Sequence, residues 1–257
     1  MPERDSSLIA AAARAGGAVA MRYWKADPRV WEKPGQGPVT EADLAVNALL
    51  ADRLRSARPS YGWLSEESTD TADRLDCEHV FIIDPIDGTR AFIAGESHFA
   101  ISIAIARNRE IIAGAIYLPA LDRLYTADET GPARMNGASI TASSRAELSG
   151  ANMLMSKGFA APENWRDPPP DLKRSFRSSI AYRLCLVAEG SFDGMVSTRD
   201  AWEWDIAAGS LIARQAGANV TDRLGNALQF NSAPAKTPGI FAAAQGVHRG
   251  ILAGLKS

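Results

Sequence analysis

The sequence predicts a protein of mixed class, with an α+β part over residues 1–147 and an α/β part over residues 148–257. Three observations favour this division. Two helical patterns open the chain, alternating apolar runs joined by tight-turn sequences follow them, and strand-like and helix-like segments alternate after about Leu148. A chain of 257 residues is long enough for one large domain or two of ordinary size, with a sizeable core in either case.

The first two predicted elements are helices. The first is expected to begin after Asp5 as its N-cap and to run toward Tyr23, with a buried face of Leu8, Ala12, Ala15 and Val19. The second is expected to begin near Thr40 and to end at about Ala57, before Pro59, with an apolar face of Leu44, Leu49, Leu50 and Leu54. The segment KADPRVWEKPGQGP (residues 25–38) is predicted to be a loop, and its part from Lys33 to Pro38 is either a mobile lid or a plain surface connection.

Short apolar runs predict the strands of the first part: YGWL, VFIID, FAISIAIA, IIAGAIYLP and RLYTAD. The sequence RNRE favours a hairpin turn between the third and fourth runs, and Asn136-Gly137 suits a second tight hairpin. We therefore expect helices packed on a largely antiparallel sheet. In the second part, the alternating segments include SIAYRLCLVAEG and WDIAAGSLIARQAG, and APENWRDPPPDLKRS is a Pro-rich loop.

Composition and charge exclude several classes of protein. The net charge of -2 and the pI near 6.0 provide no basic field for a nucleic-acid polymer and no polybasic segment for a membrane surface. No apolar stretch reaches the roughly 18 residues that span a bilayer, and Arg14 interrupts the alanine-rich N-terminal run. Cys77 and Cys185 lie far apart in no CxxC pattern, which favours reduced thiols in a cytoplasmic protein.

Acidic residues stand at four boundaries between apolar runs and turns: Asp43 in VTEAD, Glu66 and Glu67 in WLSEES, Asp84 and Asp87 in DPIDGT, and Asp205 in WEWDIAAG. Hard divalent cations such as Mg²⁺ prefer such oxygen ligands, and three histidines in the whole chain disfavour zinc. Simpler interpretations stay open for three of the boundaries. Asp43 fits a helix capping box with Thr40, the glutamates could be a solvated surface pair, and Asp205 suits the first turn of a helix.

The sequence DPIDGT is more specific. Pro85 fixes φ, and Gly88 permits a tight turn with a close backbone approach. Asp84 and Asp87 could converge on one pair of metal ions across this turn, and the hydroxyl of Thr89 could hold a water molecule. A purely structural turn would not need the second aspartate and the threonine together, so this motif favours a functional site.

The motifs together resemble those of a known family. FIIDPIDGTRAF and WDIAAGSLIARQAG are similar to the two signature motifs of the inositol monophosphatase superfamily, which are Mg²⁺-dependent, lithium-sensitive phosphatases, and WLSEES and VTEAD are similar to its two remaining motifs. Their order and spacing also match, so the resemblance covers nearly the whole chain. It implies a layered αβαβα sandwich, two or three Mg²⁺ ions, a small phosphorylated metabolite as substrate and a homodimer.

The resemblance also implies roles for the residues that match by position. A first Mg²⁺ would be held by Glu66, Asp84 and the carbonyl oxygen of Ile86, and a second by Asp84, Asp87 and Asp205. Asp43 and Thr89 would orient and deprotonate the attacking water beside Glu66, and Glu67 would support Glu66 from behind. The backbone of Gly88 and Thr89 would bind the phosphate.

Three arginines bear on the substrate: Arg90 after the phosphate-binding threonine, Arg183 in the segment SIAYRLCLVAEG, and Arg199 in STRDAWEWD. Basic residues at the first two positions and the run CLVAEG resemble bacterial 3'(2'),5'-bisphosphate nucleotidases, and guanidinium groups suit a second phosphate. We therefore expect hydrolysis of adenosine 3',5'-bisphosphate. The alternatives are an inositol-1-phosphatase, a broad sugar-phosphate phosphatase, or a catalytically silent metal- or phosphate-binding module. Ala94 stands where the inositol enzymes commonly have His, and the sequence TRAF matches the pattern of neither enzyme type.

Overall fold

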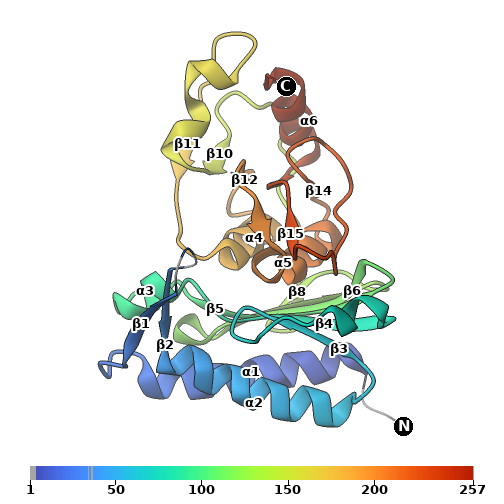
Figure 1. Ribbon diagram of the computed structural model, residues 1–257. Coiled ribbons are helices and arrows are strands. Elements are labelled where there is room, and N and C mark those ends of the chain that lie inside the picture. The colour runs from blue at the N-terminus through green and yellow to red at the C-terminus, as the bar shows by residue number, and fades with distance from the viewer. Residues whose placement is uncertain (1–3, 34, 36, 257) are drawn as a thin grey trace.

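A computed structural model describes residues 4–33, 35 and 37–256, and Figure 1 shows that they form five layers. A helix pair, a seven-stranded sheet, a second helix pair, a five-stranded sheet and a last helix follow one another from the bottom to the top of that view. The predicted αβαβα sandwich is therefore confirmed.

Strand β4 (His79–Asp87) shows how a strand between two helical layers is built. Phe81 and Ile83 belong to the hydrophobic cluster between this sheet and the helices α1 and α2, whereas Val80 and Ile82 belong to the cluster around α4 and α5. Successive side chains of a strand point to opposite faces, so a sheet covered on both sides needs apolar residues at consecutive positions. The unbroken run VFII meets this requirement.

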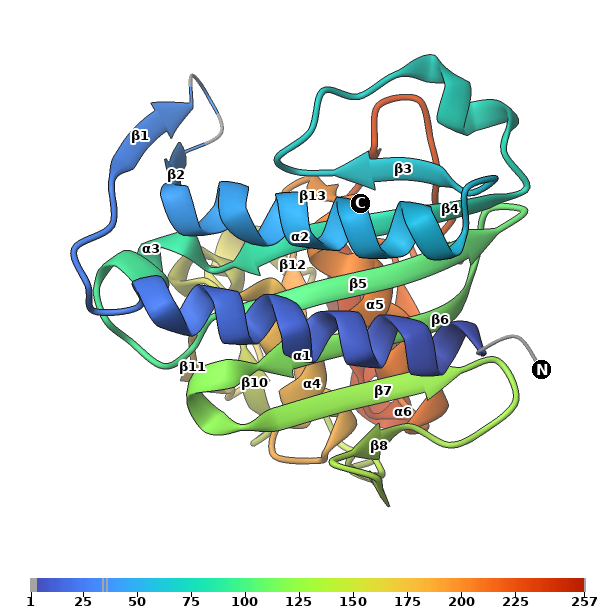
Figure 2. The ribbon, with the colours of Figure 1, turned by 90° about the horizontal axis from the view of Figure 1, so that it is seen from below.

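The outer helices α1 (Asp5–Tyr23) and α2 (Glu41–Ala57) lie side by side across the first sheet (Figure 2). Asp5 is the first helical residue of α1 and not its N-cap, which is Arg4; its carboxylate accepts hydrogen bonds from the Arg58 Nε and the Tyr61 hydroxyl. The buried face of α1 also differs from the prediction, because α1 packs on α2 and on β6 (Glu110–Leu118) at once. Its buried residues are Leu8, Ile9, Ala12, Ala13, Gly16, Gly17 and Ala20.

Four predicted core residues of these helices are not fully buried. Ala15, Val19 and Leu49 are only partly buried, and Leu44 of α2 is 45% exposed. The buried face of α1 differs from the predicted one because the helix comes close to the sheet at Gly17. A Cβ atom on this residue would lie 2.6 Å from the Tyr117 ring, so only glycine permits this approach.

The first sheet follows the predicted meander. Its strand order is β3-β4-β5-β6-β7-β8-β9, and all neighbours pair antiparallel except β3 and β4. The Asn108-Arg109 turn joins β5 to β6, and the Asn136-Gly137 turn has φ of 49° and 86°, as the sequence predicted for tight hairpins. The remaining strands are β3 (Gly62–Ser65), β5 (Ala100–Arg107), β7 (Arg123–Asp128), β8 (Arg134–Met135) and β9 (Ala138–Ser139).

The predicted loop between the outer helices contains a hairpin. β1 (Val30–Lys33) and β2 (Gly37–Thr40) pair antiparallel, and the hairpin rises beside the edge of the first sheet (Figure 1). Positions 34 and 36 of the possible lid lie outside the described residues. The period-two pattern that identifies strands is hidden in this segment by its Pro and Gly content.

The second part of the chain forms a mixed sheet of order β11-β10-β12-β16-β14. Strand β10 runs parallel to both of its neighbours, β11 and β12, whereas β16 runs antiparallel to both of its neighbours, β12 and β14. Helices α4 (Ile180–Ala188) and α5 (Glu203–Gln215) lie between the two sheets, and α6 (Gln245–Gly254) covers the far face. The strands are β10 (Asn152–Leu154), β11 (Lys173–Ser175), β12 (Gly194–Ser197), β14 (Asn219–Thr221) and β16 (Ile240–Ala243), with a separate pair of β13 (Ala201–Trp202) and β15 (Lys236–Thr237).

Short helices complete the fold: α3 (Thr89–Ile93), η1 (Ala72–Asp76), η2 (Pro119–Leu121), η3 (Lys157–Ala160) and η4 (Pro162–Asn164). The chain passes from the first sheet to the second between Ser139 and Asn152. One hydrophobic cluster includes residues of both parts, and the division into two domains at residues 147 and 148 stays a prediction.

Over the described ranges no helix has the length and apolar character that crossing a membrane requires. Cys77 and Cys185 carry free thiols.

Candidate active site

The carboxyl ends of two parallel strands bring the first acidic residues together. Glu66 directly follows β3, and its backbone N–H donates to the carbonyl of Ile83 on β4. Asp84 lies one residue further along β4, where the pairing with β5 shifts register between Asp84 and Asp87. This register shift turns the side chains of both Asp84 and Asp87 toward one end of the sheet.

Helix α5 supplies the third carboxylate. Asp205 lies in its first turn, and ligand oxygens of Glu66, Asp84 and Asp205 all lie within 4.8 Å of one another. Such a group of hard oxygen donors from three elements fits Mg²⁺ or a similar divalent ion. One of the simpler sequence interpretations does not describe this geometry, because the Glu66 side chain is only 19% exposed and is not solvated surface. Asp205 does lie in the first turn of a helix, as the simpler interpretation has it, and it also faces other acids.

Asp87 has a different environment. Its Oδ2 accepts hydrogen bonds from the Ser179 hydroxyl at 2.5 Å and from the backbone N–H of Ala181 at 2.6 Å, both at the N-terminus of α4. Asp87 therefore joins the first part of the chain to the second, and it is not among the three residues that share the closest grouping. Its role as a ligand of a second metal stays a prediction, for which Oδ1 is the oxygen not engaged by α4.

Asp43 has two roles at once. One oxygen completes the predicted capping box of α2, accepting from the backbone N–H of Thr40 at 2.8 Å and from its hydroxyl at 2.5 Å. The other oxygen lies 3.3 Å from the Thr89 hydroxyl, which also lies 3.1 Å from the carbonyl of Ile86. Since a hydroxyl has one hydrogen, Thr89 can donate to only one of these acceptors at a time.

Lys33 is a site residue to which the sequence analysis gave no role. From the end of β1, its Nζ lies 3.1 Å from Glu66 Oε1 and 2.7 Å from Glu67 Oε1. Partial burial acts to lower the pKa of Lys33, but the two glutamates outweigh it and raise that pKa. The only sequence signal was a lysine in the loop KADPRVWEKPGQGP, and its contact depends on a hairpin that this segment did not predict.

The cluster carries more negative charge than its protein partners balance. Loss of hydration raises the pKa of Asp84 and Asp205 well above their usual range, with repulsion by neighbouring carboxylates as the next cause. Loss of hydration also raises the pKa of Glu66, although Lys33 opposes it. Burial also raises the pKa of Asp43 to about 6. Acids arranged to repel one another in a cleft are typical of metal-binding and catalytic sites.

A cavity of about 500 Å³ opens beside the carboxylates. The predicted substrate residues Gly88, Thr89, Arg90 and Arg183 line it, as do Arg199, Phe176 and Trp202. The Arg183 side chain donates from Nη2 to the carbonyl of Ser178, and its guanidinium lies 4.7 Å from the centre of the Phe176 ring. Within the described ranges the buried Nε of Arg183 has no hydrogen-bond partner, so a donor is left for a ligand.

Gly88 must be glycine for two reasons. Its φ of 96° is in the left-handed region, and a Cβ atom would lie 3.2 Å from the carbonyl oxygen of His98 and 3.3 Å from the Cβ of Ser179. The tight turn starts α3 at Thr89, beside the acidic cluster.

Comparison with known proteins identifies the family. A model described as the inositol monophosphatase family matches residues 3–256. The chain belongs to the inositol monophosphatase family. Its class is therefore that of the phosphoric monoester hydrolases.

Several relatives are similar over most of their length. The inositol-1-monophosphatase of Rhizobium meliloti is 35% identical over 195 residues, 73% of each chain. That of Mesorhizobium japonicum is 33% identical over 233 residues, 84% of each chain, and the Nus factor SuhB of Haemophilus influenzae is 32% identical over 225 residues, 83% of each chain.

Solved structures share the fold. The extragenic suppressor protein SuhB from Bartonella henselae aligns with a TM-score of 0.83 at 27% identity over 96% of both chains. The IMPase of Thermotoga maritima aligns with a TM-score of 0.82 at 27% identity over 96% of this chain and 94% of that one. The inositol monophosphatase fold expected from the four motifs is confirmed.

Proposed function

We propose that this member of the inositol monophosphatase family is a Mg²⁺-dependent phosphomonoesterase whose preferred substrate is a small bisphosphate nucleotide, adenosine 3',5'-bisphosphate. The observation that carries the proposal is the position of Glu66, Asp84 and Asp205, within 4.8 Å of one another, beside a cavity also lined by three arginines. The acids suit metal ions, and the arginines suit anionic groups of a substrate.

The ligand sets follow the family resemblance. Glu66, Asp84 and the carbonyl of Ile86 would hold one ion, and Asp84, Asp87 and Asp205 a second. Bound divalent ions would offset the charge of the phosphate, activate the attacking water and stabilise the leaving alkoxide. Buried acids with raised pKa values support this assignment, because their ionised forms need cations that Lys33 and Arg183 only partly supply.

Protein groups would complete the reaction around the metal ions. Asp43 would accept a proton through the Thr89 hydroxyl, 3.3 Å from its Oδ1, and a pKa of about 6 suits a base that works near neutral pH. The backbone of Gly88 and Thr89 would bind the phosphate at the start of α3. Glu67 would hold Lys33 beside Glu66, as it does at 2.7 Å here.

The lining of the cavity supports the choice of substrate. Arg90, Arg183 and Arg199 supply three guanidinium groups, more than one phosphate needs, and the 49% exposed Phe176 offers an aromatic face to a base. A second candidate is an inositol-1-phosphatase, which the names of the Rhizobium and Mesorhizobium relatives favour.

Phosphate release tests the proposal. Purified protein with Mg²⁺ is given adenosine 3',5'-bisphosphate or inositol 1-phosphate at equal concentration, with an EDTA-treated control. We expect metal-dependent release with a kcat/KM at least about 100-fold higher for the nucleotide, about 2.7 kcal/mol of transition-state discrimination. Faster release from inositol 1-phosphate would support the second candidate. No release from either substrate would contradict the proposal and favour a silent binding module.

The family resemblance supports further parts of the same proposal: two or three Mg²⁺ ions per site, inhibition by lithium, a cytoplasmic location and a homodimer. Sedimentation at micromolar protein concentration tests the dimer, and a lithium titration of the phosphate-release assay tests inhibition.

A further inference from the structure

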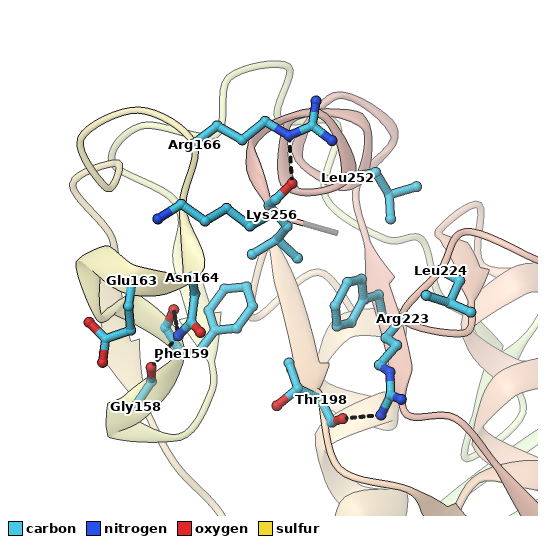
Figure 3. Close-up of a pocket in the computed structure, with 12 residues that line it drawn as sticks. Gly158, Phe159, Glu163, Asn164, Arg166, Thr198, Arg223, Leu224, Leu252 and Lys256 are labelled. Atoms are coloured by element: carbon cyan, nitrogen blue, oxygen red, sulfur yellow. Dashed lines mark hydrogen bonds between the residues drawn. The ribbon is translucent and has the colours of Figure 1, made fainter.

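A second cavity, of about 660 Å³, lies in the C-terminal part of the molecule and shares no lining residue with the active cavity. Figure 3 shows Phe159, Glu163 and Asn164 on one side of it, and Arg223 and Leu224 on the other. Small-ligand sites in proteins commonly occupy about 300–1,000 Å³, so the volume fits a ligand of ordinary metabolite size.

The lining combines an apolar floor with a basic rim. Phe159 and Phe241 are buried with their rings 6.2 Å apart, and Leu252 and the 67% exposed Leu224 extend the apolar surface. The charged lining residues are three bases and one acid: Arg166, Arg223, Lys256 and Glu163. A ligand that matches both features has an apolar body and an anionic end.

The two cavities share a wall. The loop between β12 and β13 places Thr198 in the C-terminal cavity, and Arg199 and Asp200 in the active cavity. Arg223 holds this loop, because its Nη1 donates to the carbonyl of Thr198 at 2.9 Å (Figure 3). The same Nη1 lies 3.5 Å from Asp200 Oδ1. One guanidinium of the C-terminal cavity therefore contacts the segment that carries Arg199 into the active cavity.

We propose that the C-terminal cavity binds a small amphipathic anion and that its contact with Arg223 weakens substrate binding in the active cavity. The ion pair of Arg223 with Asp200 is exposed, and such pairs contribute little to stability, so an anion held in the cavity can compete for the guanidinium. Loss of that contact frees the loop and changes the position of Arg199. By linkage, substrate and anion weaken each other's binding by the same factor.

Binding is tested with 8-anilinonaphthalene-1-sulfonate, an apolar ring system with one sulfonate. Its fluorescence is titrated with the folded protein without added phosphate, because by linkage an anion in the active cavity would weaken binding of the probe. Leu224→Glu adds a negative charge at an exposed lining position, and Leu75→Glu makes the same change at a 40% exposed leucine outside this cavity. We expect Leu224→Glu to weaken binding about 10-fold or more and Leu75→Glu to leave it unchanged.

Thermal unfolding must show that both variants are folded as well as the parent protein. Absence of fluorescence enhancement with the parent protein, or equal affinity in Leu224→Glu and Leu75→Glu, would overturn the proposed site. This measurement does not depend on phosphatase activity, so failure of the proposed function leaves it interpretable.

Coupling is tested by the KM for the phosphate substrate with and without the same probe. We expect saturating probe to raise KM about 5-fold with little change in kcat in the parent and in Leu75→Glu. The effect should be lost in Leu224→Glu and in Arg223→Gln, which removes the shared contact. An unchanged KM with bound probe would overturn the coupling, and an equal rise in Leu224→Glu would show that the probe acts in the active cavity instead.

Discussion

Two carboxylates in the first turn of α5 have opposite surroundings. Glu203 is fully buried and accepts hydrogen bonds from the backbone N–H groups of Asn231 and Ser232 and from the Ser232 hydroxyl. Burial raises its pKa, while these bonds and the charge of Arg74 act in the other direction. The negative charge of Glu203 is therefore stabilised by groups of the protein, namely these hydrogen bonds and the positive charge of Arg74.

Asp205, two residues further on, faces other acids. Loss of hydration and then the charges of Asp87 and Glu66 raise its pKa well above the usual range, and Arg183 and Lys33 only partly oppose them. A buried acid that serves stability is paired by its own fold, whereas an acid that serves binding is left for a ligand to pair. These surroundings indicate a structural role for Glu203, and they fit the metal-binding role that we propose for Asp205 on the same helix.

The largest expected effect is the loss of turnover in Asp205→Asn. The substitution keeps size and shape but removes a charge from the proposed metal site, so we expect kcat to fall by about 10³-fold or more. Circular dichroism and the unfolding midpoint should match or exceed those of the parent protein, because one repelling charge is gone. Activity within about 10-fold of the parent would show that Asp205 is not a required ligand.

The second prediction is the matching substitution of the other carboxylate of α5, Glu203→Gln. The new amide places N–H donors where Asn231 and Ser232 already donate, so we expect the free energy of unfolding to fall by about 1–3 kcal/mol in a urea titration. The folded fraction should keep a kcat within a few-fold of the parent. If Glu203→Gln instead removed activity without loss of stability, the distinction between the two carboxylates would be wrong.

The acidic cluster should also make the metal-free protein less stable as pH rises. Burial raises the pKa of Asp43 from an ordinary 3.8 to about 6, and it also raises the pKa values of Asp84 and Asp205 well above their usual range. A carboxyl with a raised folded pKa favours folding while it is protonated. Its contribution is complete below the unfolded pKa and is lost as pH rises through the folded pKa.

We therefore expect the Tm of EDTA-treated protein to fall between about pH 4 and about pH 7, and to fall less in Asp205→Asn. Saturating Mg²⁺ should raise the Tm most at the upper end of this range, because the ion binds the ionised carboxylates of the folded state. A metal-free Tm that rises throughout this range would contradict the raised pKa values.

The smallest expected effect concerns Lys33. Its ion pairs with Glu66 and Glu67 are about four-fifths buried on the lysine side, so Lys33→Gln should lower the free energy of unfolding of metal-free protein by about 1 kcal/mol. Glu32→Gln, at the neighbouring exposed position, is the control and should change it by less than about 0.5 kcal/mol. Equal effects in a denaturant titration would show that Lys33 is not held by the cluster.

The strands and the acidic motifs were predictable because their signals are local. Apolar runs predicted β4 to β7, Asn136-Gly137 predicted a hairpin, and four motifs in the family's order indicated the fold. The site residues at the strand ends followed from the same segments, since the turn in DPIDGT needs Gly88 at a positive φ.

Contacts between distant segments were not predictable from local patterns. Ser179 bonds Asp87 across 92 positions, and Lys33 reaches Glu66 across 33, from a hairpin that the Pro and Gly content concealed. The mixed order of the second sheet likewise depends on where β16 returns, which the length and periodicity of a four-residue strand do not specify. The two long-range contacts and the position of β16 all depend on tertiary packing.

The proposed metal site is tested most simply by measuring how many metal ions the protein binds. Free Mn²⁺, an oxygen-preferring substitute for Mg²⁺, is measured by electron paramagnetic resonance as it is titrated with the parent protein, Asp205→Asn and Glu203→Gln. We expect at least one tightly bound ion in the parent, equal binding in Glu203→Gln, and affinity at least about 10-fold weaker in Asp205→Asn. Equal binding in the parent and in Asp205→Asn would contradict the assignment of these carboxylates to a metal site.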